Sequence, residues 1–350
     1  MKALVLHEWG GPLVPEDRPV PEPGRGEVLV HVAACGVGDT LNNMRNGRNA
    51  SMPGAALPRI IGHEVSGTVV ATGPAVHDVE AGQSVAVYMY LTCGRCGPCR
   101  RGDDPLCRAL QGHVGLAIDG GLAEHMVVPA RNVHVLPDRV SHRDACVAVD
   151  AVATPWHALT RVVRLRPVDT LVVIGAGGGV GVHAVQVGSL LGATVIGIDV
   201  TDDKLALARA QGAVAAVDGR SDDVVAAVTD LTDGRGADVV VDYVAAASTL
   251  HAAFAYLAPM GTLVVQGVNP PGTRLTVEPR ALVGREVAVR GSRYASRTEV
   301  TEALELVARG AITPVVTRTV PLERTEDLFA LIARRELLGR GAVVGSGAAT

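Results

Sequence analysis

One glycine-rich stretch constrains the fold of this chain more than any other part of its sequence. The apolar run LVVI at residues 171–174 leads into glycines at 175, 177, 178, 179 and 181, and a segment with helical spacing of apolar residues follows. Only glycine lets the backbone turn this tightly and approach another group this closely. A buried strand, a glycine turn and a helix N-terminus together form a site for a phosphate-containing anion in an α/β sheet.

Strands and helices alternate along the whole region around this stretch. Short β-branched runs at 171–174, 195–198, 214–217, 239–242 and 263–266 are separated by candidate helices at 179–192, 202–211, 222–232 and 248–258. The runs are apolar without alternation, as in strands that are buried on both faces. The pattern therefore predicts the α/β class, with a doubly wound parallel sheet of the Rossmann type.

The rest of the chain has a different pattern. Before residue 151, short alternating segments such as EVLVHVA and SVAVYMY are broken by Gly and Pro, which predicts a β-rich domain, a partly closed barrel. After residue 294 come a helix, a strand, a second helix and a final short strand, too little for a domain of its own. We therefore expect domains at 1–150 and 151–293, with 294–350 returning to pack on the first.

The glycine turn matches a dinucleotide-binding pattern. Its spacing is Gly175-x-x-Gly178-x-x-Gly181, with Gly179 inside it, and the next strand ends in Asp199, 18 residues beyond Gly181. A carboxylate at that place accepts hydrogen bonds from the adenosine ribose and repels a 2′-phosphate. We expect NAD(H) rather than NADP(H) as the cofactor. The alternative is a structural turn that binds nothing.

Four of the six cysteines lie in one run. Cys93, Cys96, Cys99 and Cys107 have the spacing C-x2-C-x2-C-x7-C within a lobe at residues 92–108. Four thiolates on one loop suit a closed, structural zinc site. An iron–sulfur cluster, a nucleic-acid-binding zinc ribbon and four unmetalled thiols are the alternatives, but the last spacing differs from that of ferredoxins and exposed thiols oxidise readily.

Composition narrows the range of functions. The net charge is −4 and aromatic residues make up 3% of the chain, which argues against a nucleic-acid-binding surface. There is no uninterrupted apolar run of the length of about 18 residues that a membrane span needs, and no secretory segment is recognisable at the N-terminus. We expect a cytoplasmic protein that binds neither nucleic acid nor membrane.

These two motifs, together with Ile61-Gly62-His63-Glu64-Val65-Ser66-Gly67, resemble the medium-chain dehydrogenase/reductase superfamily, in particular its zinc-containing alcohol dehydrogenases. The resemblance covers essentially the whole chain. It implies a GroES-like catalytic domain beside the Rossmann domain, a small-molecule substrate, and assembly into a homodimer or homotetramer through the sheet edge near 263–292. It also places Lys204 and Val268 at the cofactor.

The sequence departs from the family's catalytic site at the Cys ligand and at the relay histidine. The family holds a catalytic zinc with a Cys, the His of a Gly-His-Glu motif and a later Cys or Asp; His63 and Asp150 match the last two, but Gly38 stands at the Cys position. Thr40 matches the proton-relay hydroxyl, but Asn43 stands at the position of the relay histidine. Cys35 comes three residues too early and is expected in the core.

Two kinds of hydride chemistry stay open. In the first, a zinc on His63 and Asp150, with Glu64 or Asp39 as further ligands, polarises a small alcohol or carbonyl and Thr40 passes the proton. In the second, no metal acts, and donors such as Thr40 or Asn43 hold the oxygen of an enone, enoyl or quinone substrate whose C=C bond is reduced. A non-enzymatic NAD(H)-binding protein is the third possibility. His63 could also simply bond to backbone, and Asp150 could cap a helix.

Overall fold

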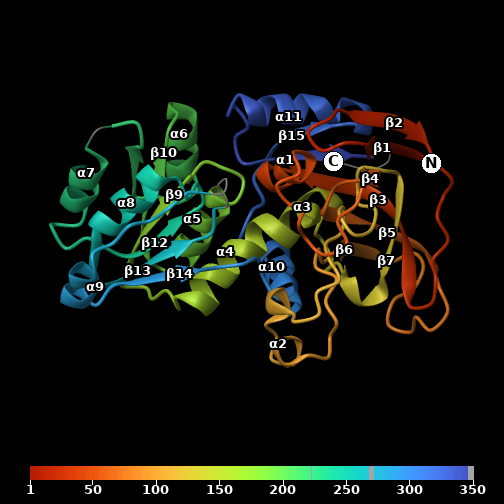
Figure 1. Cartoon of the computed structure of the whole chain (residues 1–350), viewed down its shortest axis with the longest axis horizontal. Coiled ribbons are helices and arrows are strands. Elements are labelled where there is room, and N and C mark those ends of the chain that lie inside the picture. The colour runs from red at the N-terminus through yellow and green to blue at the C-terminus, as the bar shows by residue number, and fades with distance from the viewer. Residues whose placement is uncertain (222, 268–271, 346–350) are drawn as a thin grey trace. The chain divides into compact units, whose positions relative to one another are not determined.

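The protein, described by a computed structural model for residues 1–221, 223–267 and 272–345, divides into two compact units (Figure 1). Unit 1 comprises Met1–Ala153 and Ala295–Thr350, and unit 2 comprises Thr154–Tyr294. The C-terminal segment thus belongs to the same unit as the N-terminal half.

Unit 2 is built on a parallel sheet of six strands in the order β11-β10-β9-β12-β13-β14. The strands are β9 (Thr170–Ile174), β10 (Thr194–Asp199), β11 (Ala215–Asp218), β12 (Ala237–Asp242), β13 (Leu257–Val265) and β14 (Ala288–Gly291). The order reverses between β9 and β12, so the sheet is doubly wound, as predicted. All five predicted strands are present, and the edge strand β14 is additional.

Helices connect these strands. They are α5 (Gly181–Leu190), α6 (Asp202–Ala210), α7 (Val224–Leu231), α8 (Ala247–Ala255) and α9 (Pro279–Arg285). The prediction placed the helix after the glycine turn two residues too early, because the turn itself runs to Val180. It also extended the fourth helix to 258, whereas α8 ends at Ala255 and β13 starts at Leu257.

Unit 1 is rich in strands, as expected. A three-stranded sheet has the order β2-β1-β4, and a seven-stranded sheet has the order β15-β16-β3-β5-β6-β8 with β7 paired to β3. Strands from the N-terminal part are β1 (Lys2–Leu6), β2 (Leu13–Asp17), β3 (Glu27–Val37), β4 (Arg59–Ile60), β5 (Glu64–Thr72), β6 (Ser84–Val87), β7 (His125–Pro129) and β8 (Val133–Val135). Its helices are α1 (Asp39–Arg45), α2 (Gly97–Arg100) and α3 (His142–Val147), and α4 (Ala153–Trp156) leads into unit 2.

The C-terminal segment supplies α10 (Arg297–Ala308), β15 (Val316–Val320), α11 (Thr325–Ala333) and β16 (Arg340–Val344) to unit 1. Strand β16 pairs antiparallel with the end of β3, with Gly341 opposite Val37. This pairing brings Arg340, at the start of β16, to the point where β3 ends and α1 begins. A residue near the C-terminus therefore joins a site formed by the first half of the chain.

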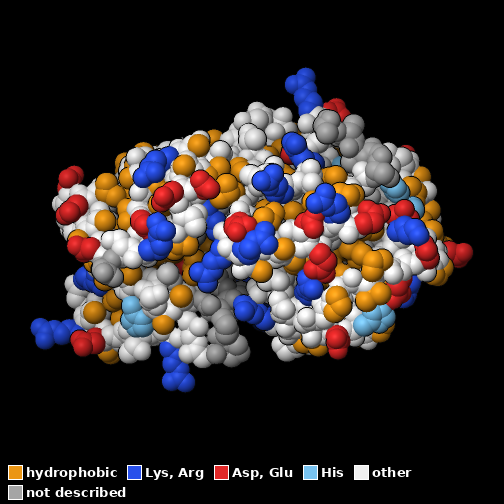
Figure 2. All heavy atoms as spheres, turned by 90° about the horizontal axis from the view of Figure 1, so that it is seen from above, with side chains coloured by type: hydrophobic (Ala, Val, Ile, Leu, Met, Phe, Trp, Pro, Cys, Tyr) orange, Lys and Arg blue, Asp and Glu red, His pale blue; other side chains and the backbone are white. Residues whose placement is uncertain are grey.

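Each unit has its own apolar core, which in unit 1 includes Leu6, Leu41 and Leu122 and in unit 2 Ile196, Leu250 and Leu263. Charged side chains of both signs are interspersed on the face shown in Figure 2, without a continuous basic patch. No helix among the described residues combines the length and the apolar character needed to cross a membrane.

Candidate functional site

The glycine turn after β9 has the geometry of an anion-binding loop. Gly175 has φ +82°, a left-handed conformation that favours glycine. A Cβ atom on Gly181 would collide with the carbonyl oxygen of Gly175, and one on Gly177 would lie 2.6 Å from the Cα of Lys204. A Cβ on Gly178 would meet only the Gly175 carbonyl oxygen within 4 Å among the described residues. The turn is therefore closely packed underneath and open at Gly178, three residues before α5 begins at Gly181.

Asp199 holds this turn in place. Its Oδ2 accepts a hydrogen bond of 2.8 Å from the backbone N–H of Gly177, and its Oδ1 accepts one of 2.8 Å from Val200. The Nζ of Lys204 lies 3.9 Å from Oδ1. Gly179 accepts a hydrogen bond from Nδ1 of His183 at 2.8 Å. Val268, the remaining predicted cofactor residue, lies outside the described residues.

These features fit a dinucleotide. In this fold the N-terminal N–H groups of a helix bind a pyrophosphate at such a turn, and a carboxylate at the end of the following strand recognises the ribose. No arginine interacts with Asp199 in the described part of unit 2. Arg220 instead forms an ion pair with Asp218, with Nη2 and Oδ2 2.7 Å apart.

The four clustered cysteines converge on one point in unit 1. The Sγ of Cys96 lies 3.4 Å from that of Cys99 and 3.9 Å from that of Cys107, and Cys93 Sγ is 4.0 Å from Cys99 Sγ. Zinc–sulfur bonds of about 2.3 Å in a tetrahedron separate the sulfurs by about 3.8 Å. All four thiols are free of disulfides. The quartet therefore has the spacing and the composition of a structural zinc site. A zinc ion there would link the two ends of the segment from Cys93 to Cys107.

Backbone groups prepare this quartet for a metal. N–H groups of Cys99 and Arg108 lower the pKa of Cys96 to about 6, which favours the thiolate. The N–H of Cys96 points to Cys93 Sγ at 3.4 Å, and that of Cys93 to Cys107 Sγ at 3.3 Å. Donors of this kind stabilise metal-bound thiolates.

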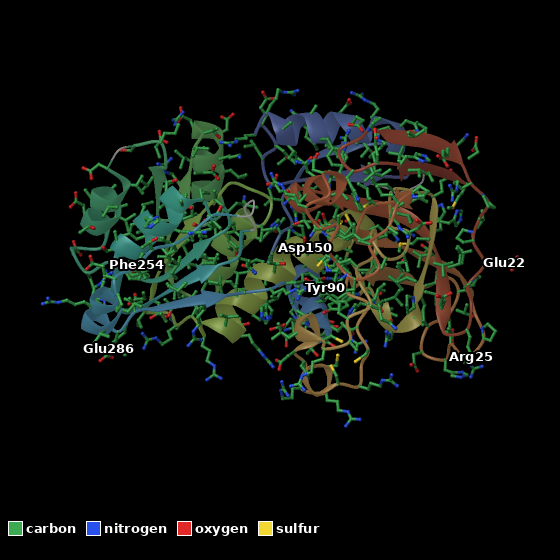
Figure 3. All side chains as sticks on the ribbon, viewed as in Figure 1. Glu22, Arg25, Tyr90, Asp150, Phe254 and Glu286 are labelled. Carbon is green, nitrogen blue, oxygen red and sulfur yellow. The ribbon has the colours of Figure 1, made fainter. Side chains whose placement is uncertain are left out.

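The second group of predicted ligands also comes together in unit 1. His63, Glu64 and Asp150 are all buried, and their ligand atoms lie within 4.8 Å of one another. His63 Nε2 is 3.7 Å from Glu64 Oε1 and 3.5 Å from Asp150 Oδ2. Asp150, labelled in Figure 3, lies in the first turn of a π-helical segment, Ala148–Val152, whose N-cap residue is Val147, so Asp150 is not the cap residue. Neither ring nitrogen of His63 has a hydrogen-bond partner among the described residues.

Arg340 completes this cluster and was not among the residues predicted from the sequence. Its Nη2 donates to Glu64 Oε1 at 2.7 Å and to Asp150 Oδ2 at 3.1 Å. Burial alone would lower the pKa of Arg340, but Glu64, Asp150 and Asp39 outweigh it and raise the pKa above the ordinary value. Burial raises the pKa of Glu64, whereas at Asp150 His63 and Arg340 outweigh burial and lower the pKa. The side chain of Arg340 is thus a charged group between two acidic ones.

The cluster does not fit the catalytic zinc of the family. At the position of the family's thiolate, Gly38 is the residue before α1. A Cβ atom there would overlap Nη1 of Arg340 and lie 2.6 Å from its Cζ. The guanidinium therefore fills the space of the missing ligand, and it already bonds to both carboxylates that a metal would need.

The remaining predicted residues lie on α1. Asp39 is exposed, while Thr40 and Asn43 are half-buried. Cys35 is fully buried on β3, as expected of a core residue, and burial raises the pKa of its thiol. The only sequence signals for Arg340 were a lone basic residue before the apolar run AVV and an unexplained glycine at 38.

Comparisons with known proteins agree with this architecture. The alcohol dehydrogenase GroES-like domain matches residues 24–138, and the zinc-binding dehydrogenase domain matches residues 179–309. The NAD-dependent alcohol dehydrogenase of Sulfurisphaera tokodaii is 33% identical over 350 residues, which cover 98% of this chain and all of that protein.

Two solved structures are also similar. The alcohol dehydrogenase of Aeropyrum pernix superimposes with a TM-score of 0.91 at 32% identity, covering 98% of this chain and 100% of that one. The cobalt- and zinc-bound alcohol dehydrogenase of Pyrobaculum aerophilum superimposes with a TM-score of 0.87 at 28% identity, covering 98% and 99%. The chain belongs to the alcohol dehydrogenase family of the medium-chain dehydrogenase/reductase superfamily, with a GroES-like domain and a Rossmann domain.

Proposed function

We propose that this protein is an NAD(H)-dependent oxidoreductase that transfers hydride between the nicotinamide and a small alcohol or carbonyl compound. The observation that carries the proposal is the open glycine turn held by Asp199, in a chain whose relatives are named NAD-dependent alcohol dehydrogenases. Gly175, Gly178, Gly179 and Gly181 would hold the pyrophosphate, and Asp199 and Lys204 would lie at the ribose.

The chain's own residues have distinct tasks in this reaction. NAD(H) supplies or accepts the hydride when bound. Reduction of a carbonyl also consumes one proton, which we assign to the hydroxyl of Thr40, and oxidation of the alcohol returns it. Asn43 would donate a hydrogen bond to the substrate oxygen, and Asp39 lies next to Thr40 on α1. The Thr40 hydroxyl suits the first task because it takes up a proton from water as it passes one to the substrate oxygen, and the Asn43 amide suits the second because it donates a hydrogen bond and keeps its proton.

Reduction of a conjugated C=C bond is a second candidate function. The observation that favours it is the absence of a thiolate at Gly38 and the presence of a guanidinium in its place. Donors around the carbonyl oxygen of an enone would stabilise the enolate that forms when hydride adds to the β-carbon.

The test is turnover with purified protein. NADH oxidation is followed with an aldehyde, a ketone and an enone, and NADH and NADPH binding is measured by calorimetry. Oxidation with the aldehyde or the ketone supports the first function, and oxidation with the enone alone supports the second. NADH binding without turnover would indicate a non-enzymatic binding protein, and no binding would contradict the proposal.

Cofactor selectivity gives a sharper test of the ribose assignment. Asp199→Gly is expected to reduce the preference for NADH over NADPH by at least about tenfold, because the charge that repels a 2′-phosphate is removed. Asp202→Asn is the matched control, since the Asp202 side chain is 92% exposed. Unchanged selectivity in Asp199→Gly would show that this carboxylate does not face the ribose.

We also propose assembly into a homodimer or homotetramer through the edge of the six-stranded sheet. Apolar side chains are exposed on the last elements of this unit: Met260 on β13 at 76%, Val283 on α9 at 78% and Val289 on the edge strand β14 at 43%. An exposed edge strand with apolar neighbours is a natural pairing surface. Light scattering measures the assembly.

We also infer a reducing, cytoplasmic location, because the thiols of the cysteine quartet are free of disulfides.

A further inference from the structure

The two carboxylates of the His63 cluster already have a cationic partner. The hydrogen bonds of 2.7 and 3.1 Å from Arg340 go to Glu64 Oε1 and Asp150 Oδ2, the same oxygens that face His63 Nε2. Arg340 is 3% exposed, so water offers these oxygens little competition. A buried carboxylate needs such a partner, and a planar guanidinium provides it with directed N–H groups.

Gly38 and Arg340 are sterically matched. Gly38 has φ −154°, an extended conformation that any residue adopts, so its backbone does not require glycine. What requires glycine is the guanidinium, because a Cβ at this position would overlap Nη1. Gly38 stands where the family has its thiolate ligand, and the same glycine leaves room for the guanidinium of Arg340.

A metal and this guanidinium compete for the same place. A zinc bound to His63 and Asp150 would share oxygens with Arg340 and put two cations side by side in a buried site. Coulomb repulsion at such short range is weakly screened away from water. Zinc binding would require Arg340 to leave, and its departure would leave a hollow beside Gly38.

We propose that the guanidinium of Arg340 is the permanent cation of this site and takes the place of the catalytic metal of the family. The protein then carries one zinc per chain, in the cysteine quartet. The charge of the guanidinium is balanced by the carboxylates of Glu64 and Asp150. The metal count does not depend on the proposed function.

Metal analysis of purified, dialysed protein tests the proposal. We expect one zinc per chain in the wild-type protein, and no further uptake when zinc chloride is titrated by calorimetry. Two zinc ions per chain, with the second lost in His63→Ala, would overturn the proposal. This measurement needs no substrate, so an inactive protein would contradict the proposed function and leave the metal count decisive.

A set of variants tests the steric match. Gly38→Cys combined with Arg340→Ala restores the family's ligands and removes the guanidinium, so we expect a gain to two zinc ions per chain. Gly38→Cys alone should stay at one zinc, because Arg340 occupies the space of the new thiolate. A second zinc in Gly38→Cys alone would contradict the competition. Circular dichroism confirms folding of each variant, and the wild-type count remains decisive if the double variant does not fold.

Discussion

Unit 1 contains two clusters of potential metal ligands that solve the same electrostatic problem in different ways. In the cysteine quartet Cys96 Sγ lies 3.4 Å from Cys99 Sγ and 3.9 Å from Cys107 Sγ, Cys93 Sγ lies 4.0 Å from Cys99 Sγ, and backbone N–H groups are the donors around it. The His63 cluster has two carboxylates and a histidine, all buried, and an arginine bonded to both carboxylates. The cysteine quartet needs a bound metal cation, whereas the His63 cluster already contains the guanidinium of Arg340.

The comparison shows that ligand residues alone do not define a metal site. His63, Glu64 and Asp150 are close enough to bind a metal. What distinguishes them from the cysteines is a fourth residue that is distant in the sequence and brings a positive charge. The charge balance of a buried cluster therefore has to be counted over all the residues that contact it.

The largest expected effect comes from removing one ligand of the cysteine quartet, because only this cluster requires zinc. Cys99→Ser should lose the zinc and lower the melting temperature by about 10 °C or more, because binding of a structural metal is coupled to folding. Calorimetry with metal analysis measures both. Cys35→Ala is the control, since Cys35 is buried outside the quartet and the variant should keep its zinc. Equal stability of Cys99→Ser and wild type would break the comparison.

The next largest effect on stability is expected when the guanidinium of Arg340 is removed. Arg340→Ala leaves Glu64 and Asp150 without their guanidinium and is expected to reduce the free energy of unfolding by about 3–5 kcal/mol. Arg334→Ala is the matched control in the same segment, because its ion pair with Glu336 is more than half exposed, and it should cost about 0.5 kcal/mol or less. Denaturant unfolding measures both, and equal effects would speak against a buried role for Arg340.

A smaller effect is expected from one added methyl group. Gly38→Ala should destabilise by about 1–3 kcal/mol, because the guanidinium has to shift away from the new Cβ. Gly284→Ala, where a Cβ meets nothing within 4 Å and the residue lies in α9, should be neutral or stabilising. In an Arg340→Ala background the cost of Gly38→Ala should disappear. A cost that persists there would place the clash elsewhere.

The smallest expected effect concerns acid stability on β8. Burial and the charge of Arg297 lower the pKa of His134 to about 4, and its Nε2 is buried without a hydrogen-bond partner in the described part of the chain. Because the unfolded state takes up the proton first, the stabilisation is complete above about pH 6.5 and is lost as the pH falls toward 4. His134→Gln should reduce the acid loss between about pH 7 and about pH 5 by about 2 kcal/mol while keeping a polar group near Thr301. Identical pH profiles of the variant and wild type would show that His134 does not titrate in this range.

Much of this molecule could be predicted from its sequence because patterns within short segments determine it. The strand β9, the glycine turn and Asp199 follow from apolar runs and glycine spacing within about 30 residues. The cysteine quartet follows from one short run in the same way. Both depend on residues that are near one another in the chain.

The parts that were missed depend on pairing between distant segments. Arg340 reaches Glu64 and Asp150 only because β16 pairs with β3, and nothing in the residues around Arg340 announces that pairing. The short elements α9 and β14 lack the length that gives a clear periodic signal. The sequence did reveal that Gly38 was anomalous; the structure shows which side chain fills the space.

The central claim is tested most directly by anomalous X-ray scattering from a crystal of the wild-type protein, with data collected on both sides of the zinc absorption edge. We predict one zinc peak per chain, among the sulfurs of Cys93, Cys96, Cys99 and Cys107, and guanidinium density next to Gly38. A second zinc peak between His63 and Asp150, with Arg340 turned away, would contradict it.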